Sequence, residues 1–165
     1  MVGQGISVKV LGIDPGKKGA AVLLRENGQI DMIWDTPTLT IGKKVVHDPT
    51  AMANIIRPYT TRAYVAIEDV HAMPGQGVTS MFQFGVGFGL WQGIIAALQM
   101  PVTFYTPQAW KKGVLAGMPP GKGASLVRAK QLWPTCSMFS RAKDEGRAEA
   151  ALIAHHHQLQ MNRHG

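Results

Sequence analysis

The sequence has 165 residues, 45% of them hydrophobic, which is enough to build one globular domain over residues 1–165 and excludes a disordered chain. Lys and Arg number 17 against 10 Asp and Glu, and the net charge of +7 favours a polyanionic partner such as nucleic acid. The single cysteine, Cys136, excludes an internal disulfide and a cysteine-based zinc site. No apolar run is long enough for a membrane span and no secretory signal is visible, so we expect a protein that is neither membrane-bound nor secreted.

The chain opens with a pattern of three short strands. Residues 7–13, 20–25 and 29–35 are short apolar runs rich in aliphatic side chains. Asn27-Gly28 lies between the second and third runs and is typical of a tight hairpin, because both residues tolerate positive φ. We therefore expect an antiparallel three-stranded meander, followed by a polar connection over residues 37–46.

Helices and strands alternate in the rest of the chain. Asp48-Pro49 and Thr106-Pro107 each combine an N-cap residue with a proline at the first helical position. We expect helices at 49–56, 80–99, from 107, 124–132 and 145–159, and strands at 63–67 and 101–105. This order predicts an α/β fold, a five-stranded mixed sheet with helices on both faces.

The helix at 80–99 is unusual because it contains several glycines, each of which costs a helix about 1 kcal/mol relative to alanine. The glycines are Gly85, Gly87, Gly89 and Gly93. They indicate close packing against another backbone, either within the monomer, which we favour, or in a second copy of the chain.

Acidic residues follow two of the predicted strands. Asp14 ends the first strand and Glu68 ends the strand at 63–67. A carboxylate at the edge of a core is unfavourable without a partner, because it loses hydration. If the two strands are parallel neighbours, both carboxylates lie side by side about 4.8 Å apart, and they repel unless a cation lies between them.

A third group of acids begins the last helix. Glu145 and Glu149 are one turn apart and share a helix face, and Asp144 directly precedes that helix. Oxygen ligands suit Mg²⁺ or Mn²⁺, and two such ions can hold the attacking and leaving oxygens of a phosphodiester. The ordinary alternative is that these acids only complement the helix dipole.

Taken together, these motifs resemble the RuvC family of Holliday-junction resolvases, in particular its phage and plant-organelle branch. The matching segments are residues 12–16, 67–68, 84–93, 107–111 and 143–154, which span almost the whole chain in the family's order. The resemblance implies an RNase H-like fold, a homodimer, and Mg²⁺-dependent paired nicking of four-way DNA junctions that leaves 5′-phosphate and 3′-hydroxyl ends. It also implies a protein of the bacterial or phage-infected cytoplasm or of an organellar nucleoid.

The resemblance assigns the catalytic and metal-site roles to Asp14, Glu68, Asp144 and Glu149, with two Mg²⁺ ions that Mn²⁺ can replace. Related sequences often have histidine at the position of Glu145, and other branches space the last two acids three apart, which here falls on Gly146. The fourth ligand is therefore Asp144 or Glu145, and we favour Asp144 because it matches the motif letter for letter.

Relatives insert a side chain at the junction centre from the loop after Glu68. In this chain His71 or Met73 would be that wedge, and Gln76 could read a base. Basic residues supply candidate phosphate contacts. They are Lys17, Lys18, Lys43, Lys44, Lys111, Lys112, Lys122 and Arg147, of which we rank Lys111 and Lys112 first because they belong to a family motif.

Three other functions fit parts of the pattern. An RNase H-type nuclease acting on RNA–DNA hybrids would use the same acids. An actin- or Hsp70-like ATPase shares the opening aspartate–glycine motif but needs two such domains, so we expect no nucleotide cofactor. A catalytically inactive junction-binding protein would not need the full set of acids.

Overall fold

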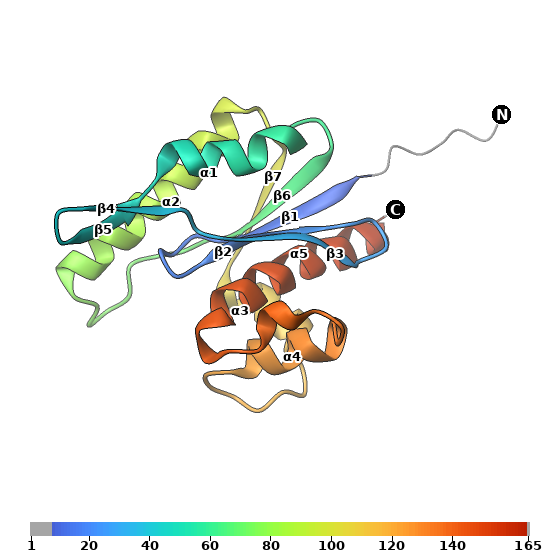
Figure 1. Ribbon diagram of the computed structural model, residues 1–165. Helices are drawn as coiled ribbons and strands as arrows, with labels where there is room; N and C mark the ends of the chain where they lie inside the picture. The colour runs from blue at the N-terminus through green and yellow to red at the C-terminus, as the bar shows by residue number, and fades with distance from the viewer. Residues whose placement is uncertain (1–7, 165) are drawn as a thin grey trace.

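The computed structural model describes residues 8–164 and contains the predicted five-stranded mixed sheet (Figure 1). Its strand order is β3-β2-β1-β6-β7, with β1 antiparallel to β2, β2 antiparallel to β3, and β1, β6 and β7 parallel. The strands are β1 (Lys9–Asp14), β2 (Ala20–Leu24), β3 (Ile30–Asp35), β6 (Ala63–Glu68) and β7 (Val102–Tyr105). The opening meander and the parallel arrangement of β1 and β6 are thus confirmed.

Helices cover both faces of the sheet, as predicted. One face carries α1 (Pro49–Ile56) and α2 (Val78–Ala97), and the other carries α3 (Pro107–Val114), α4 (Ala124–Leu132) and α5 (Glu145–His164) (Figure 1). Short 3₁₀ turns lie at Arg57–Tyr59, Ser137–Phe139 and Ala142–Asp144. The last helix runs to His164, five residues past the predicted end, because the polar sequence after Leu159 has no helix breaker.

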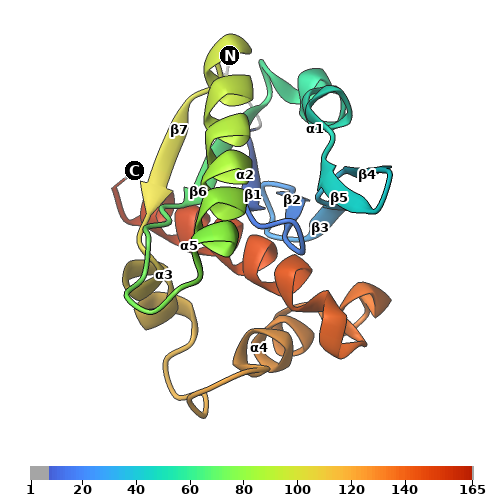
Figure 2. The same cartoon turned by 90° about the vertical axis from the view of Figure 1, so that its left-hand side faces the viewer.

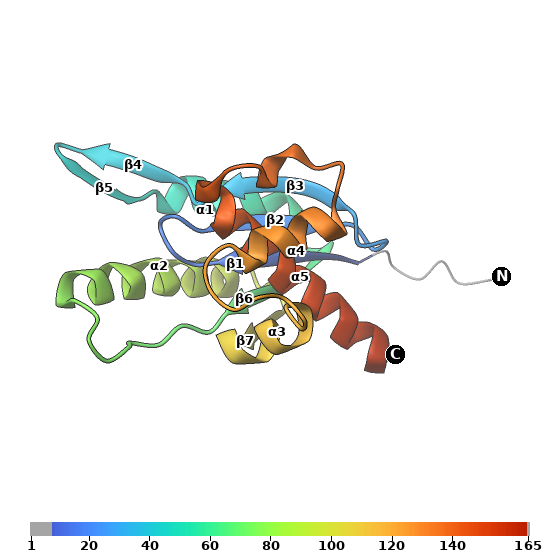
Figure 3. The same ribbon diagram turned by 90° about the horizontal axis from the view of Figure 1, so that it is seen from below.

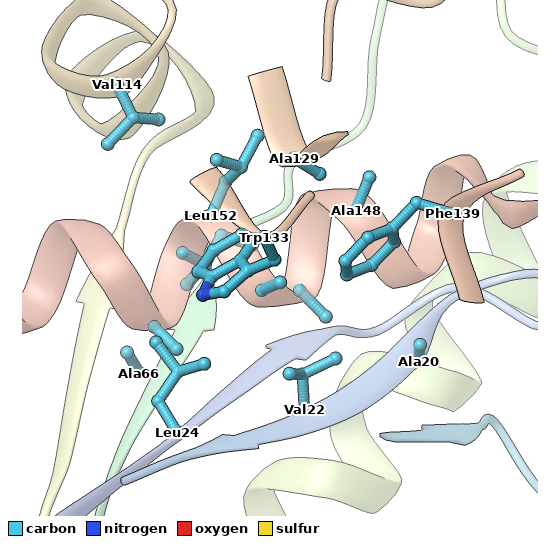
Figure 4. Packing of buried hydrophobic residues seen from close by; sticks show 14 of the residues in the cluster. Ala20, Val22, Leu24, Ala66, Val114, Ala129, Trp133, Phe139, Ala148 and Leu152 are labelled. Carbon is cyan, nitrogen blue, oxygen red and sulfur yellow. The ribbon is translucent and has the colours of Figure 1, made fainter. Parts of the chain in front are cut away.

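The alternation of side chains along each strand divides the core into two layers. On β1, Val10 faces the cluster under α3, α4 and α5, whereas Leu11 faces the cluster under α1 and α2. Figure 4 shows the first layer, in which Trp133 and Phe139 pack against the alanine-rich face of α5. The small side chains of α5 let the helix lie close to the sheet, and a Cβ at Gly12 would collide with the carbonyl oxygen of Ala150.

Both predicted helix starts are confirmed. The Asp48 carboxylate accepts a hydrogen bond from the Ala51 N–H at 3.0 Å, and the Thr106 hydroxyl accepts one from the Ala109 N–H at 3.2 Å. Each helix has proline in its first turn. These starts were predictable because every interaction involved is local in sequence.

The polar connection predicted at residues 37–46 is wrong. This segment forms an antiparallel hairpin of β4 (Thr38–Ile41) and β5 (Lys44–His47), in which Gly42 takes the turn with φ of 61°. Figure 3 shows it projecting past the end of the five-stranded sheet. The strands were missed because all of β4 is exposed, so the segment lacks the buried apolar run that marks the other strands.

The prediction of close packing within the monomer holds for one of the four helix glycines. A Cβ at Gly87 would collide with the His47 imidazole and the Pro15 carbonyl oxygen. At Gly85, Gly89 and Gly93 a Cβ would meet no atom of residues 8–164 within 4 Å. The described helices include none long and apolar enough to cross a membrane.

Candidate active site

Asp14 and Glu68 lie at the same end of two neighbouring parallel strands. Ile13 of β1 is in register with Ile67 of β6, so the next residue on each strand is an acid at the sheet's carboxyl edge. Burial, together with the charges of Glu149 and Glu68, raises the pKa of Asp14 from 3.8 to about 8. The prediction that the strands carrying Asp14 and Glu68 are parallel neighbours is therefore confirmed.

Glu149 reaches the same place from the second turn of α5. Burial, with smaller contributions from the charges of Glu68 and Glu145, raises its pKa from 4.5 to about 7, against the opposing effect of Lys111. Burial also raises the pKa of Glu68, although a hydrogen bond from Trp110 and the charge of Lys111 oppose the rise. Acids from three separate segments thus repel one another at one point, and each is more easily protonated as a result.

Two neighbouring residues of α3 hold these carboxylates from one side. The fully buried Trp110 donates its indole N–H to Glu68 Oε2 at 2.7 Å. The Lys111 ammonium lies 3.9 Å from Glu149 Oε1. The sequence pattern identified Lys111 only as a phosphate contact, and it gave no role to Trp110.

Asp144 differs from these acids because its carboxylate is already fully paired. It accepts hydrogen bonds from the backbone N–H of Arg141 at 2.8 Å and from the Arg141 guanidinium, and Arg147 lies 3.3 Å away. Although Asp144 is only 1% exposed, the hydrogen bonds from Arg141 lower its pKa. Asp144 lines the same cavity as Asp14, Glu68 and Glu149, but its pairing with Arg141 and Arg147 makes its carboxylate less available for a ligand than theirs.

Glu145 is better placed than Asp144. It shares a helix face with Glu149 and raises the pKa of that residue. Its Oε1 accepts a hydrogen bond from the backbone N–H of Gly123 at 3.1 Å, which ties α5 to the start of α4. Its other oxygen accepts no hydrogen bond from the described residues.

The position three residues before Glu149 cannot carry a side chain. A Cβ at Gly146 would collide with the carbonyl oxygen of Lys18 and with Gly19, because the start of α5 packs directly on the β1–β2 turn. An acid at position 146, three residues before Glu149, therefore cannot be accommodated. The acid of α5 that precedes Glu149 on the same helix face is Glu145.

These acids line a cavity of about 1470 Å³ whose rim is basic. Lys17 and Lys18 come from the β1–β2 turn, and Lys111 and Lys122 from α3 and the loop before α4. All four lysines are exposed. An anionic polymer would therefore meet positive charge at the rim before it reaches the carboxylates.

The other predicted DNA contacts fall into three groups. Arg147 lines the cavity, but it is only 12% exposed and forms two hydrogen bonds with Asp35, at 2.6 and 2.7 Å. Lys112 is exposed but does not line the cavity. His71 and Gln76 line a separate hollow of about 250 Å³ against α2, and Met73 is 65% exposed beside them.

The donor set fits a hard divalent cation, but its geometry is not preformed. Within residues 8–164, no three His, Cys, Asp or Glu side chains are placed closely enough to hold an ion as they stand. All the acids involved offer oxygen, which Mg²⁺ and Mn²⁺ prefer. The raised pKa values of Asp14 and Glu149 show negative charge that the chain's own cations leave uncompensated.

Ser125 is a further residue that the sequence did not indicate. It is buried at the start of α4, and its hydroxyl hydrogen-bonds to Glu149, which lowers the pKa of that acid. No sequence signal distinguishes it from any other serine near a helix start. Its role depends on α4 and α5 packing together, which is a tertiary feature.

No protein-family model and no curated protein matches the sequence. The structure does match RuvC of Thermus thermophilus in complex with a Holliday junction substrate, with a TM-score of 0.62, 15% identity, and coverage of 94% of this chain and 96% of that one. The chain has a RuvC-like fold. A second Thermus thermophilus RuvC structure matches with a TM-score of 0.55, 16% identity, and coverage of 94% and 97%. The RuvC-like fold accounts for the strand order that places Asp14 beside Glu68.

Proposed function

We propose that this protein is a metal-dependent endonuclease that resolves four-way DNA junctions. It would act as a homodimer, place one nick in each of two opposite strands, and leave 5′-phosphate and 3′-hydroxyl ends. The observation that carries the proposal is the meeting of Asp14, Glu68 and Glu149 at the floor of a cavity with a basic rim. A RuvC-like fold supports the choice of a branched DNA substrate.

In the proposed site, Asp14, Glu68, Glu149 and Glu145 would hold the metal. A divalent cation bound there would lower the pKa of a water molecule and offset charge on a phosphodiester. Trp110 donates to one oxygen of Glu68 and so orients that carboxylate, leaving the other oxygen for a ligand. Lys111 is placed among the carboxylates, where its ammonium could contact a phosphate that enters the cavity.

The proposed dimer would use the exposed face of α2. Val78, Phe82 and Val86 are 84%, 67% and 36% exposed on this helix. The open glycines on the same helix would let a second backbone approach closely. A dimer would also supply the two active sites that paired nicking requires.

The proposal is tested by incubating the purified protein with a synthetic four-way junction, with and without Mg²⁺, and mapping nicks at nucleotide resolution. We expect symmetric nicks on opposite strands that DNA ligase can reseal. An RNA–DNA hybrid duplex in parallel distinguishes an RNase H-type activity. Cleavage of the hybrid with an intact junction would reject the substrate assignment, and random nicking of plain duplex would reject junction selectivity.

The oligomeric state is tested separately, by light scattering of the wild type and of Phe82→Glu. We expect a dimer for the wild type and a monomer for the variant, because a buried charge in an apolar interface is strongly unfavourable. Val127→Glu on α4 is the matched control, since Val127 is also an exposed apolar residue of a helix, at 47%. A wild-type monomer in the presence of junction DNA would reject the dimer.

A further inference from the structure

The β4–β5 hairpin belongs to neither of the two core layers, and it touches the site described above only at its base. It pairs only with itself, and every residue of β4 is exposed. An isolated two-stranded hairpin is marginally stable in water, so its conformation depends on how its base is attached. Its base is packed against the rest of the protein, whereas residues 41–44 at its tip are exposed, and a Cβ at Gly42 would meet no atom of the described residues within 4 Å.

The anchor is His47, the last residue of β5. This side chain is 5% exposed and packs against Gly87 of α2 and the Pro15 carbonyl. A Cβ at position 87 would collide with the His47 imidazole and with the Pro15 carbonyl oxygen. Lys17 adds a second attachment, because its ammonium donates to the carbonyl oxygen of Val45 at 3.4 Å. The hairpin is thus attached to the turn that directly follows Asp14.

The hairpin extends outward from the rim of the cavity. Thr38, at its base, lines the cavity, and the turn at its far end contains Gly42 and Lys43. Figures 1 and 3 show that the hairpin projects past the sheet in the same direction as the first half of α2. In Figure 2 the side of the molecule that carries the hairpin faces the viewer. The four extended residues of β4 span roughly 13 Å between Thr38 and the turn.

The charge of the hairpin is entirely positive. Residues 36–47 contain Lys43 and Lys44 and no Asp or Glu, and both lysines are exposed. Lys17 and Lys18 extend the same charge to the cavity rim. A second copy of the chain, at +7, would meet like charge here, whereas a polyanion would meet its complement.

We propose that the β4–β5 hairpin is an arm that binds the phosphate backbone of one duplex arm of the substrate outside the active site. This inference rests on the proposed function and adds a second contact region to it. Phosphates of one strand advance by about 3.4 Å along the duplex axis, so the lysines reach roughly four base pairs from the phosphate in the cavity. Ile41, 64% exposed at the tip, lies where it can contact the sugars between those phosphates.

The test compares Lys43→Ala/Lys44→Ala with Arg57→Ala/Arg62→Ala, which removes the same charge from exposed residues near the opposite end of β6. Junction binding is measured in the Asp14→Asn background, so that cleavage does not interfere, over a series of salt concentrations. We expect the hairpin variant to bind the junction at least about tenfold more weakly than the parent protein at about 0.1 M salt. The slope of log K against log salt concentration should become shallower by about 1 to 2, because each phosphate contact contributes about 0.9. The control variant should change the affinity and the slope by less.

Neutral methylphosphonates placed four to six nucleotides from the mapped nick locate the contact. They should weaken binding of the parent protein but leave the hairpin variant unaffected, because the charge they remove is the one the lysines contact. Equal effects of both double variants, or equal sensitivity of both proteins to methylphosphonates, would overturn the arm assignment while junction cleavage stands. A change in oligomeric state of the hairpin variant would instead assign the arm to a second copy, and failure of the parent protein to bind junctions would reject the proposed function.

Discussion

Two groups of acids line the same cavity, and their pKa values are shifted in opposite directions. Asp14, Glu68 and Glu149 have raised pKa values, because burial dominates for all three, repulsion between acids adds to it for Asp14 and Glu149, and Lys111 is the one cation of the described residues that opposes it. Asp144 and Asp35 have lowered pKa values, because Arg141 and Arg147 donate hydrogen bonds to them. Asp144 is nevertheless the most buried of these acids by exposed surface. Burial therefore does not decide whether a carboxylate is available for a ligand, whereas the presence of an arginine partner does.

The largest effect is expected from Asp14→Asn. Loss of the central carboxylate should reduce Mg²⁺-dependent junction nicking by at least about 1000-fold, because metal-assisted catalysis contributes several kcal/mol. The same variant should unfold at a higher temperature than the wild type in EDTA at pH 8, since it removes an unpaired buried charge. Glu26→Gln, at an exposed acid, should change neither measurement. Nicking within tenfold of wild type would remove Asp14 from the site.

Asp144→Asn should have the opposite effect on stability. It leaves two arginines without their buried partner, which costs about 3 kcal/mol of unfolding free energy in urea titrations. If Asp144 were instead an unpaired metal ligand, the variant would be as stable as wild type or more stable without metal. Circular dichroism across the titration distinguishes the two outcomes, with Glu26→Gln again as the control.

The pH dependence of the free energy of unfolding distinguishes the acids with raised pKa values from Asp144 and Asp35 without a mutation in the latter pair. A raised pKa means that the folded protein binds a proton that the unfolded chain has released, so stability falls as pH rises toward about 8 for Asp14 and about 7 for Glu149. Between pH 6.5 and 8 the fall should reach up to about 1.4 kcal/mol per pH unit for each group. The histidines with lowered pKa values act in the opposite direction, because stability rises with pH until the unfolded histidines, with a pKa of 6.5, have lost their protons. The effect of the acids is therefore read most clearly between about pH 7.5 and 8.

Urea unfolding in EDTA at four pH values in this window measures the slope. Asp14→Asn should remove most of it above pH 7, whereas the stabilising effect of Asp144 is lost only when the pH falls below its unfolded value near 3.8. A wild-type stability that is constant or rises from about pH 7.5 to 8 would contradict the assignment of unpaired charge to Asp14.

The smallest effect is expected from Trp110→Phe, which keeps most of the buried volume but removes the donor to Glu68. Loss of a residue that orients a ligand typically costs 10- to 100-fold, and we expect about tenfold in nicking rate. Metal affinity, measured by calorimetry, should fall in parallel while unfolding free energy changes by less than about 1.5 kcal/mol. An unchanged affinity with reduced stability would assign Trp110 to packing alone.

Much of the fold was predictable because its signals are local. The helix starts at Asp48 and Thr106 and the hairpin at Asn27-Gly28 follow from neighbouring residues. The adjacency of Asp14 and Glu68 required only that their strands be parallel neighbours. The features that bear on the choice between Asp144 and Glu145 were not predictable, because the pairing of Asp144 with Arg141 and the contact between Gly146 and Lys18 appear only in the folded structure. The hairpin at 38–47 was missed because its exposed strands lack a buried apolar run.

The close contacts at Gly12 and Gly146 have a mechanical consequence. They press α5 onto β1 and onto the turn after Asp14, so the backbone positions of Asp14 and Glu149 form one rigid block. Glu68 is held differently, through the indole of Trp110 on the short helix α3, which is followed by a glycine- and proline-containing loop. The pairing of β6 with β1 and β7 fixes the backbone of Glu68 as well, so the part of the site that can adjust is the Glu68 side chain together with the indole of Trp110 that orients it.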